Sequence, residues 1–341
     1  MPASQQPRRV AVHFVLLPDS LILDWAGPAE ALRIANQVLL AQGQEAVFEL
    51  HFVGPSPSTR SSVGACISQI EPLPELQPAA QAGAGSASHC DWVVLVGQPG
   101  RRLDLDHAEG RAVLHWLRGL RLAPDRLELL CVCAGAVIAA HAGLLAQHRA
   151  TTHHQHLDEL REVEPHCEVV QNRVFVLDPP LSSSAGVTTG IDLMLHRIAG
   201  VCGPAVTAQV AQTLVVALRR GPQDPELSPF LNHRNHLHPA LHRVQDAVSQ
   251  APQLDWTVPR MADVAHTSAR HLGRLFAEHA GIAPLAYLRQ IRLAVAQAAL
   301  QSGHNVTQAA AMAGFSSDTQ LRRTWHDLGM AGLPSGLSGG G

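Results

Sequence analysis

The sequence predicts an α/β first part, with a parallel sheet covered by helices on both faces, followed by an all-α second part with two helix-turn-helix motifs. Two observations carry this prediction. Short apolar runs alternate with helix-like patterns as far as about residue 198, and the stretch 267–276 repeats at 316–325. Strands that alternate with helices favour a parallel sheet between two helical layers. Each copy of the repeat follows a small-residue helix pattern and a short turn, as in a helix-turn-helix.

The strands of the first part are expected where apolar residues run almost without interruption, because both faces of such a strand are covered. The predicted strands are Val10–Leu17, Phe48–Val53, Trp92–Val96, Leu127–Val132 and Val174–Leu177. The predicted helices are Ala29–Leu40, Ala108–Leu120, Ala136–Leu145 and Ile191–Ile198. Residues 72–88 are crowded with Pro, Gln, Ala, Gly and Ser, which predicts a surface loop.

Changes in composition divide the chain, whose 341 residues are enough for two or three domains. We expect an α/β domain at 8–220 and a linker at 221–240, where Pro, His and Asn are frequent. A helical domain follows at 241–330. The Gly/Ser-rich end, 331–341, is expected to be a disordered tail.

Charge is distributed unevenly along a chain whose net charge is −3. Residues 1–240 carry 17 arginines and 22 acidic residues, whereas residues 241–341 carry 8 arginines and 6 acidic residues. A mildly basic tail on an acidic body fits a nucleic-acid-binding module joined to another domain. The first apolar run, eight residues long, is too short for a secretory signal or a membrane span. We therefore expect a cytoplasmic protein without membrane contact.

The six cysteines contain no C-x-x-C pair, so we expect neither a disulfide framework nor a structural zinc site. The sequence also gives no reason to expect a metal or another cofactor. His153, His154 and His156 form a cluster, but neighbouring histidines on regular structure point apart, which disfavours a metal site.

Apolar stripes at helical spacing define the repeated motif in the second part. The first helix of each copy is marked by Val258, Met261, Ala262 and Ala265, and by Val306, Ala309, Ala310 and Ala313. The second helices carry Leu272, Leu275 and Phe276, and Leu321, Thr324, Trp325 and Leu328. Ser268 is expected to cap the second helix of the first copy, and Gly314 to make the turn in the other. One long helix, Pro284–Leu300, is expected to join the copies.

Specific residues extend this pattern to a resemblance. Arg-His-Leu-x-Arg-Leu-Phe at 270–276, Gly-x-x-Pro-x-x-Tyr-Leu at 281–288 and Ala-Gly-Phe-Ser-Ser at 313–317 occur in this order. With these motifs the last quarter of the chain resembles the AraC/XylS family of transcription regulators. The resemblance implies that the second helix of each motif enters the major groove of double-stranded DNA.

The resemblance also places the DNA contacts on outward positions of those two helices. For base contacts it implies Ala269, Arg270, Gly273 and Arg274 in the first motif, and Asp318, Thr319, Gln320 and Arg323 in the second. Arginine can bind guanine through two hydrogen bonds, and glutamine can pair with adenine. Thr267, Ser317 and Arg322 are the candidates for phosphate contacts, which position a protein without reading sequence. The alternative is a helical dimerisation bundle whose arginines are merely solvated.

A cysteine lies where a strand turns into a helix in the first part. Cys133 follows the strand Leu127–Val132 and precedes a helix rich in Ala and Gly, which is the layout of a nucleophile elbow. A helix N-terminus favours the thiolate form. Asp24 follows the first strand, and the turn at Gly97 could offer backbone amides to the same pocket.

Further motifs give this part a resemblance of its own. They are Leu-Asp-x-x-Gly-Pro at 23–28, Val-Cys-Ala-Gly-Ala at 132–136, Ala-Gly-Leu-Leu at 142–145, Arg-Ala-Thr-Thr-His at 149–153, and Ser-Ala-Gly with Gly-Ile-Asp within 184–192. The segment 8–215 resembles the ThiJ/PfpI superfamily, which has the class I glutamine amidotransferase-like fold. Joined to an AraC-type tail, it is similar to GlxA-type regulators. That similarity implies a front domain that senses a small, often nitrogen-containing effector and dimerises, and a tail that changes DNA affinity or contact with RNA polymerase.

The resemblance leaves three functions open for the elbow. We expect a ligand pocket lined by Asp24, Gly97, Cys133, Ala134 and His153. Peptidases of the superfamily have His directly after the cysteine, where this chain has Ala134, whereas its hydratases pair the cysteine with an Asp. A hydratase or amidase that uses Cys133 and Asp24 is therefore the alternative, and a Cys133 redox sensor is the third reading. Our prediction is a regulator rather than an enzyme.

Overall fold

The computed structural model describes residues 9–76, 89–216, 220–222, 233–234, 236, 238–328 and 330. The chain divides into two compact units, 1–226 and 227–341, which are described separately below. Most of the linker expected at 221–240, the tail expected at 331–341 and part of the loop expected at 72–88 lie outside the described residues. The boundaries given above for the domains stay predictions.

The first unit is built on a seven-stranded sheet in the order β10-β11-β7-β6-β1-β2-β5. Its strands are β1 (Arg9–Val15), β2 (Phe48–Gly54), β5 (Glu71–Pro72), β6 (His89–Leu95), β7 (Leu127–Val132), β10 (Phe175–Asp178) and β11 (Leu181–Ser184). All neighbours run parallel except β10, which pairs antiparallel with β11. Two short pairs lie outside this sheet, formed by β3 (Ser58–Arg60) with β4 (Cys66–Ser68), and by β8 (Arg149–Ala150) with β9 (Glu168–Val169).

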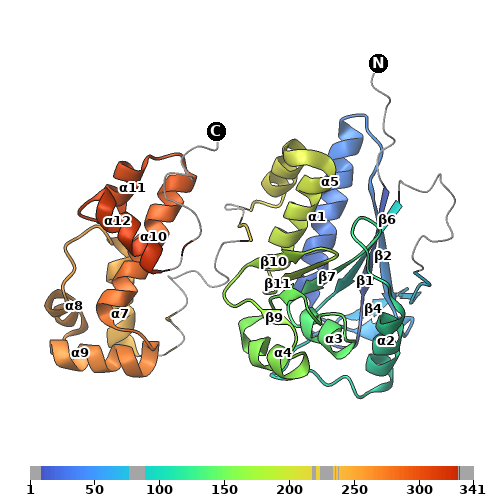
Figure 1. Cartoon of the computed structure of the whole chain (residues 1–341), viewed down its shortest axis with the longest axis horizontal. Coiled ribbons are helices and arrows are strands. Elements are labelled where there is room, and N and C mark those ends of the chain that lie inside the picture. Colours follow the sequence, from blue (N-terminus) through green and yellow to red (C-terminus); the bar gives the residue numbers. More distant parts are fainter. Residues whose placement is uncertain are drawn as a thin grey trace. The chain divides into compact units, whose positions relative to one another are not determined.

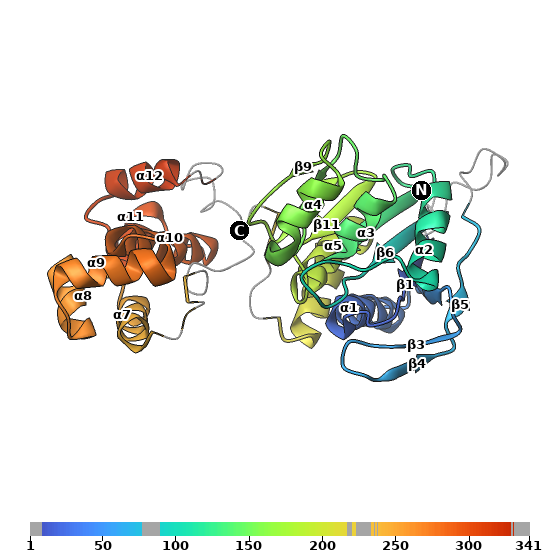
Figure 2. The ribbon, with the colours of Figure 1, turned by 90° about the horizontal axis from the view of Figure 1, so that it is seen from below.

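Helices cover both faces of the sheet, as the sequence predicts. They are α1 (Ile22–Ala41), α2 (Ala108–Gly119), α3 (Gly135–His141), α4 (Leu157–Val163) and α5 (Thr189–Thr213), with a short 3₁₀ turn, His154–His156, before α4. Figures 1 and 2 show α1 and α5 together on one face and α2 and α3 on the other. Leu32 and Ile198 belong to the core on the first face, and Val113 and Val137 to the core on the second. The α/β prediction for the first unit is confirmed.

Two helices are longer than the sequence predicts, and each contains a Gly-Pro pair. Helix α1 begins at Ile22 rather than Ala29, so Pro28 lies inside it. Asp24, which the predicted helix start at Ala29 left outside the helix, lies in the first turn of α1. Helix α5 runs to Thr213, and the pair Gly203-Pro204 only kinks it, with φ of 83° at Gly203.

In the second unit the described residues form helices and turns without a strand, which confirms the all-α prediction. The helices are α7 (Pro239–Gln250), α8 (Val258–Ala265), α9 (Ala269–Leu275), α10 (Pro284–Gln301), α11 (Val306–Ala313) and α12 (Asp318–Asp327), and the π-helical turn Phe276–Ala280 extends α9. Helices α8 and α9 form one helix-turn-helix, and α11 and α12 form the other (Figure 1).

Capping residues set where the motif helices begin and end. The Oγ atoms of Ser268 and Ser317 accept hydrogen bonds from the third residue of α9 and α12, as expected of N-caps. His266, with φ of 56°, is the C-cap of α8, and Gly314, with φ of 80°, is the C-cap of α11. Of the stripe expected on α12, Leu321 and Trp325 are buried, but Leu328 is exposed.

Helix α10 connects the two motifs through two adjoining cores. Its first half gives Tyr287, Leu288 and Ile291 to the core under α7, α8 and α9. Its second half gives Leu293, Ala296, Ala299 and Leu300 to the core under α11 and α12. Because both cores share one continuous helix, the two motifs hold a fixed mutual arrangement.

The loop between α7 and α8 also touches both halves of the second unit. The guanidinium of Arg292 on α10 donates to the carbonyl oxygens of Pro252 (2.9 Å) and Leu254 (2.8 Å). Gly314, in the turn of the second motif, lies so close to this loop that an added Cβ would come within 2.5 Å of the Gln253 Cα. The loop is thus a second connection between the motifs.

We predict that Gly314→Ala destabilises the second unit more than Gly303→Ala. Both glycines have positive φ, so alanine costs about 1–2 kcal/mol of conformational strain at each. No atom lies within 4 Å of a Cβ at Gly303, whereas one at Gly314 overlaps the Gln253 backbone. In urea unfolding, Gly314→Ala should lower the free energy of unfolding by more than about 1 kcal/mol beyond the loss seen for Gly303→Ala. Hydrogen exchange of α11 assigns the transition to this unit, and equal losses would contradict the close contact.

Candidate functional site

The elbow at Cys133 is formed by backbone geometry that the sequence pattern predicts. Cys133 follows β7 directly and has φ of 58°, in the left-handed region that non-glycine residues seldom adopt. Its amide donates to the Ser184 carbonyl (3.0 Å), and its own carbonyl accepts from the Thr152 hydroxyl (2.8 Å). Gly135, at the start of α3, packs on β6 so closely that a Cβ there would lie 2.3 Å from the Leu95 carbonyl oxygen. These contacts hold the strained turn in place.

Asp24 joins three segments of the carboxyl edge of the sheet. Its Oδ2 accepts from the Gly97 amide (2.9 Å) after β6, and its Oδ1 accepts from the Val187 amide (3.0 Å) between β11 and α5. The Cys133 side chain is hydrogen-bonded to the same carboxyl group. Burial raises the pKa of Asp24 to about 6, although all three hydrogen bonds favour the ionised form.

The structure brings four of the five predicted pocket residues into contact, but as a packed cluster. Asp24 is 0%, Cys133 3% and Ala134 0% exposed. A Cβ on Gly97 would lie 2.8 Å from Asp24 Oδ2 and 2.9 Å from the Cys133 Cβ. On the other side, a Cβ on Gly186 would lie 2.6 Å from the Cys133 Sγ. The glycines therefore let two loops close over the thiol.

His153, the fifth predicted residue, follows the Thr152 that supports the elbow carbonyl, and its ring interacts with its own segment. The ring lies 4.2 Å from the His154 ring, and its Nδ1 accepts from the Gln155 amide. Burial lowers the pKa of His153 to about 4, and the nearby His154 and His156 add to this effect. The expectation that neighbouring histidines here point apart is wrong. Whether any of the five residues contacts a ligand stays a prediction.

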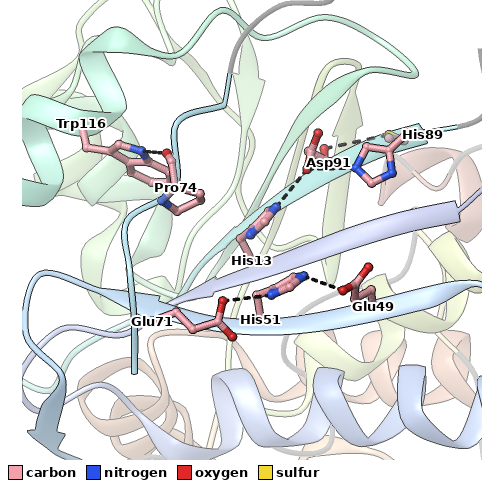
Figure 3. Close-up of polar contacts among 9 residues, drawn as sticks. His13, Glu49, His51, Glu71, Pro74, His89, Asp91 and Trp116 are labelled. Atoms are coloured by element: carbon pink, nitrogen blue, oxygen red, sulfur yellow. Dashed lines mark hydrogen bonds and ion pairs between the residues drawn. The ribbon is translucent and has the colours of Figure 1, made fainter. Parts of the chain in front are cut away.

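Sequence reasoning missed a second polar cluster, on the sheet face that carries α2. Figure 3 shows the rings of His13 on β1 and His51 on β2 close to one another. The two rings are stacked, with 5.0 Å between their centroids. His13 Nε2 lies 2.9 Å from Asp91 Oδ1 on β6, and His51 Nδ1 lies 3.1 Å from Glu71 Oε2 on β5. The apolar run around His13 concealed its role. Each histidine on this largely apolar sheet face thus has a carboxylate partner, which compensates for the burial of a polar ring.

Both predicted recognition helices present arginines to solvent. Arg270 and Arg274 on α9, and Arg322 and Arg323 on α12, are exposed. The Arg323 side chain is 84% exposed and lies 3.9 Å from Asp327. The remaining predicted base-contact positions, Ala269, Gly273, Asp318 and Thr319, are exposed or half-buried on the same two helices. Of the phosphate candidates, Thr267 is half-buried, whereas Ser317 is exposed and caps α12.

Two predicted contact residues on α12 already have partners within the protein. Gln320 Oε1 accepts from the amide (2.8 Å) and the hydroxyl (3.0 Å) of Ser316. Asp318 Oδ2 accepts from the Thr307 hydroxyl (2.9 Å) on α11. Adenine recognition by glutamine uses the amide oxygen as well as the nitrogen. Gln320 must therefore release Ser316 before it can read adenine in the predicted way.

Comparisons with known proteins agree with this geometry. A family model for a helix-turn-helix domain matches residues 261–328, from α8 to the end of α12. The transcriptional regulator GlxA of Rhizobium meliloti (strain 1021) is 29% identical over 330 residues, covering 96% of both chains. CdhR of Pseudomonas aeruginosa PAO1, also an HTH-type transcriptional regulator, is 28% identical over 92% of this chain and 87% of its own. A ThiJ/PfpI family crystal structure from Pseudomonas syringae aligns with a TM-score of 0.48 and 16% identity, covering 73% of this chain and 93% of that one.

These findings define the class: a DNA-binding, HTH-type transcription regulator in which an α/β domain precedes a helix-turn-helix domain. Within this class the chain is similar to the GlxA-type regulators, and the similarity extends over nearly its whole length. The relatives are named as regulators, in agreement with our prediction of a regulator rather than an enzyme. In the described part of the chain, no helix is both long and apolar enough to cross a membrane.

We predict that the stability contribution of Asp24 falls as the pH rises. The folded-state pKa, about 6, is raised above the ordinary value of 3.8, so the proton binds more tightly in the folded state. The contribution is complete below pH 3.8 and is lost as the pH passes through about 6, by about 3 kcal/mol in total. Asp24→Asn should be less stable than the wild type at pH 4.5, because one backbone amide loses its acceptor. In urea unfolding, the difference in free energy of unfolding between the wild type and Asp24→Asn should become smaller towards pH 8. A difference that grows with pH would mean that folding lowers the pKa of Asp24.

Proposed function

We propose that the second unit binds two successive major grooves of double-stranded DNA and that the first unit controls this binding by sensing a small effector. The observation that carries the proposal is the pair of motifs on α10, each with a capped helix whose arginines are exposed. Arg270, Arg274 and Arg323 would contact bases, and Arg322 would contact phosphate. The continuous helix α10 favours binding to two successive grooves, because it fixes the orientation of one motif relative to the other.

Effector control requires two states that the effector distinguishes, since a ligand shifts an equilibrium only by its difference in affinity. We propose that a homodimer forms through the first unit and that the effector changes either DNA affinity or contact with RNA polymerase. The similarity to HTH-type transcriptional regulators, which extends over nearly the whole length of the chain, supports this mechanism. A protein that acts on chromosomal DNA in this way would work in the cytoplasm of a prokaryotic cell.

The first test selects DNA from a random-sequence pool with the full-length protein. We expect one sequence family to be enriched, and its affinity to fall steeply with salt as the arginines displace counterions. Arg323→Ala should weaken binding to the selected site about 5- to 150-fold, equivalent to about 1–3 kcal/mol. Fluorescence anisotropy with labelled duplexes provides the measurement.

The matched control is Arg111→Ala, which removes an exposed arginine from α2 in the first unit. It should leave affinity for the selected duplex within twofold of the wild type. Failure to enrich any sequence, or equal affinities for Arg323→Ala and Arg111→Ala, would contradict DNA recognition by α12.

A further inference from the structure

A cavity of about 340 Å³ lies where the connections from two central strands diverge. The chain leaves β1 towards β2 on one side, whereas β6 is its neighbour on the other. Pro18 and Asp19, after β1, and Gln98 and Pro99, after β6, line the cavity. In open α/β sheets, ligands bind outside the carboxyl ends of strands at such a divergence. The volume is at the small end of the range for ligand sites, about 300–1,000 Å³.

Gln98 provides an acceptor whose hydrogen-bonding capacity is unused. The residue is only 8% exposed, and its Nε2 donates to the Pro18 carbonyl (2.6 Å). Its Oε1 is buried and has no hydrogen-bond partner among the described residues. A buried acceptor without a partner costs about 1–3 kcal/mol. A ligand N–H placed against Oε1 would remove this cost.

The charged groups of the cavity wall favour a cation. Three carboxylates line it, from Asp19, Asp104 and Glu109. The wall also contains Arg102, which is already paired with Glu162 on α4, outside the wall. His107 lines it too, and its Nδ1 lies 3.2 Å from Glu109 Oε2, which leaves Asp19 and Asp104 as the carboxylates that face a ligand without this partner. Asp19 also has φ of 60°, a strained conformation of the kind that occurs at binding sites.

We propose that this cavity is the effector site and that its ligand is a small molecule with a protonated amine or amidine. The cationic nitrogen would lie against the carboxylates and donate an N–H to Gln98 Oε1. This inference rests on the proposed effector response and gives it a location next to the Cys133 elbow. Gln98 follows Gly97, whose amide binds Asp24, so the two sites share a turn.

Because Oε1 is buried, a ligand reaches it only when a neighbouring segment moves. The bend 99–102, which follows Gln98 directly and gives Pro99 and Arg102 to the same wall, is the segment assigned to this movement. Gly100 within it has φ of 120°, a conformation open to glycine, and can act as a hinge. The end of the bend is held to α4, because Arg102 pairs with Glu162 and the Leu103 amide donates to Glu159 Oε1 (2.8 Å). Ligand entry would therefore strain or break these two contacts with α4.

The test measures binding of small amines to the full-length protein by isothermal titration calorimetry, without DNA. The probes are ethanolamine and agmatine, together with choline, the N-trimethyl analogue of ethanolamine. Choline keeps the charge but has no N–H to donate. We expect at least one N–H probe to bind, and choline to bind at least tenfold more weakly than ethanolamine if ethanolamine is that probe.

Two variants remove the proposed contacts separately. Gln98→Met removes the acceptor, and Asp19→Asn removes a charge while keeping a side chain that tolerates positive φ. Each should weaken binding of the N–H probe at least tenfold. Gln37→Met, on the exposed face of α1, is the matched control and should bind as the wild type does.

The proposal is overturned if neither N–H probe binds at millimolar concentration, or if choline binds as tightly as ethanolamine. Unchanged affinity in both Gln98→Met and Asp19→Asn would also overturn it. DNA selection is scored separately. Enriched DNA without amine binding would refute this site alone, and amine binding without enriched DNA would refute the regulatory function.

Discussion

The carboxylate of Asp24 is the interaction on which the functional edge of the first unit depends. One buried side chain accepts the amides of Gly97 and Val187 and is hydrogen-bonded to Cys133. It therefore ties together the start of α1, the end of β6, the elbow after β7 and the loop before α5. A buried carboxylate is unfavourable unless such hydrogen bonds compensate for the lost hydration. Here the compensation is incomplete, since the pKa is raised to about 6.

In the second unit, stability and function depend on the continuity of α10. A helix-turn-helix buries little apolar surface alone, and here each motif completes its core with half of the same helix. The contacts of Arg292 and Gly314 with the loop 252–254 add a connection that no single motif could provide. Burial of the Arg292 guanidinium lowers its pKa, yet two backbone carbonyls retain it in this position.

Much of this architecture follows from local pattern, and the exceptions have identifiable causes. Buried strands such as β7 are evident from continuous apolar runs, and the motif helices from apolar stripes, with Ser268 marking the start of α9. The start of α1 was missed because local propensity disfavours Gly-Pro inside a helix, whereas burial of α1 against α5 outweighs this cost.

The site was harder to predict because its decisive properties depend on distant contacts. Sequence motifs could place Asp24, Gly97 and Cys133 near one another, but they could not show that Gly186 closes over the thiol. The motifs likewise gave Gln320 a role on DNA without showing that Ser316 occupies its amide oxygen. Gln98 attracts no attention in the sequence, since its significance lies in an oxygen that finds no partner after folding.

That oxygen has the energetic scale that regulation requires. A tenfold change in DNA affinity corresponds to 1.4 kcal/mol of coupling between sites, and allosteric couplings are typically about 1–3 kcal/mol. Satisfying one buried acceptor releases about the same amount. An effector that pairs with Gln98 only after the bend at 99–102 has moved would bind one state better than the other by this margin. Without effector, the protein would occupy the state in which Gln98 Oε1 has no hydrogen-bond partner. The free-energy cost of that unpaired acceptor would then be the free energy that effector binding uses to change DNA affinity.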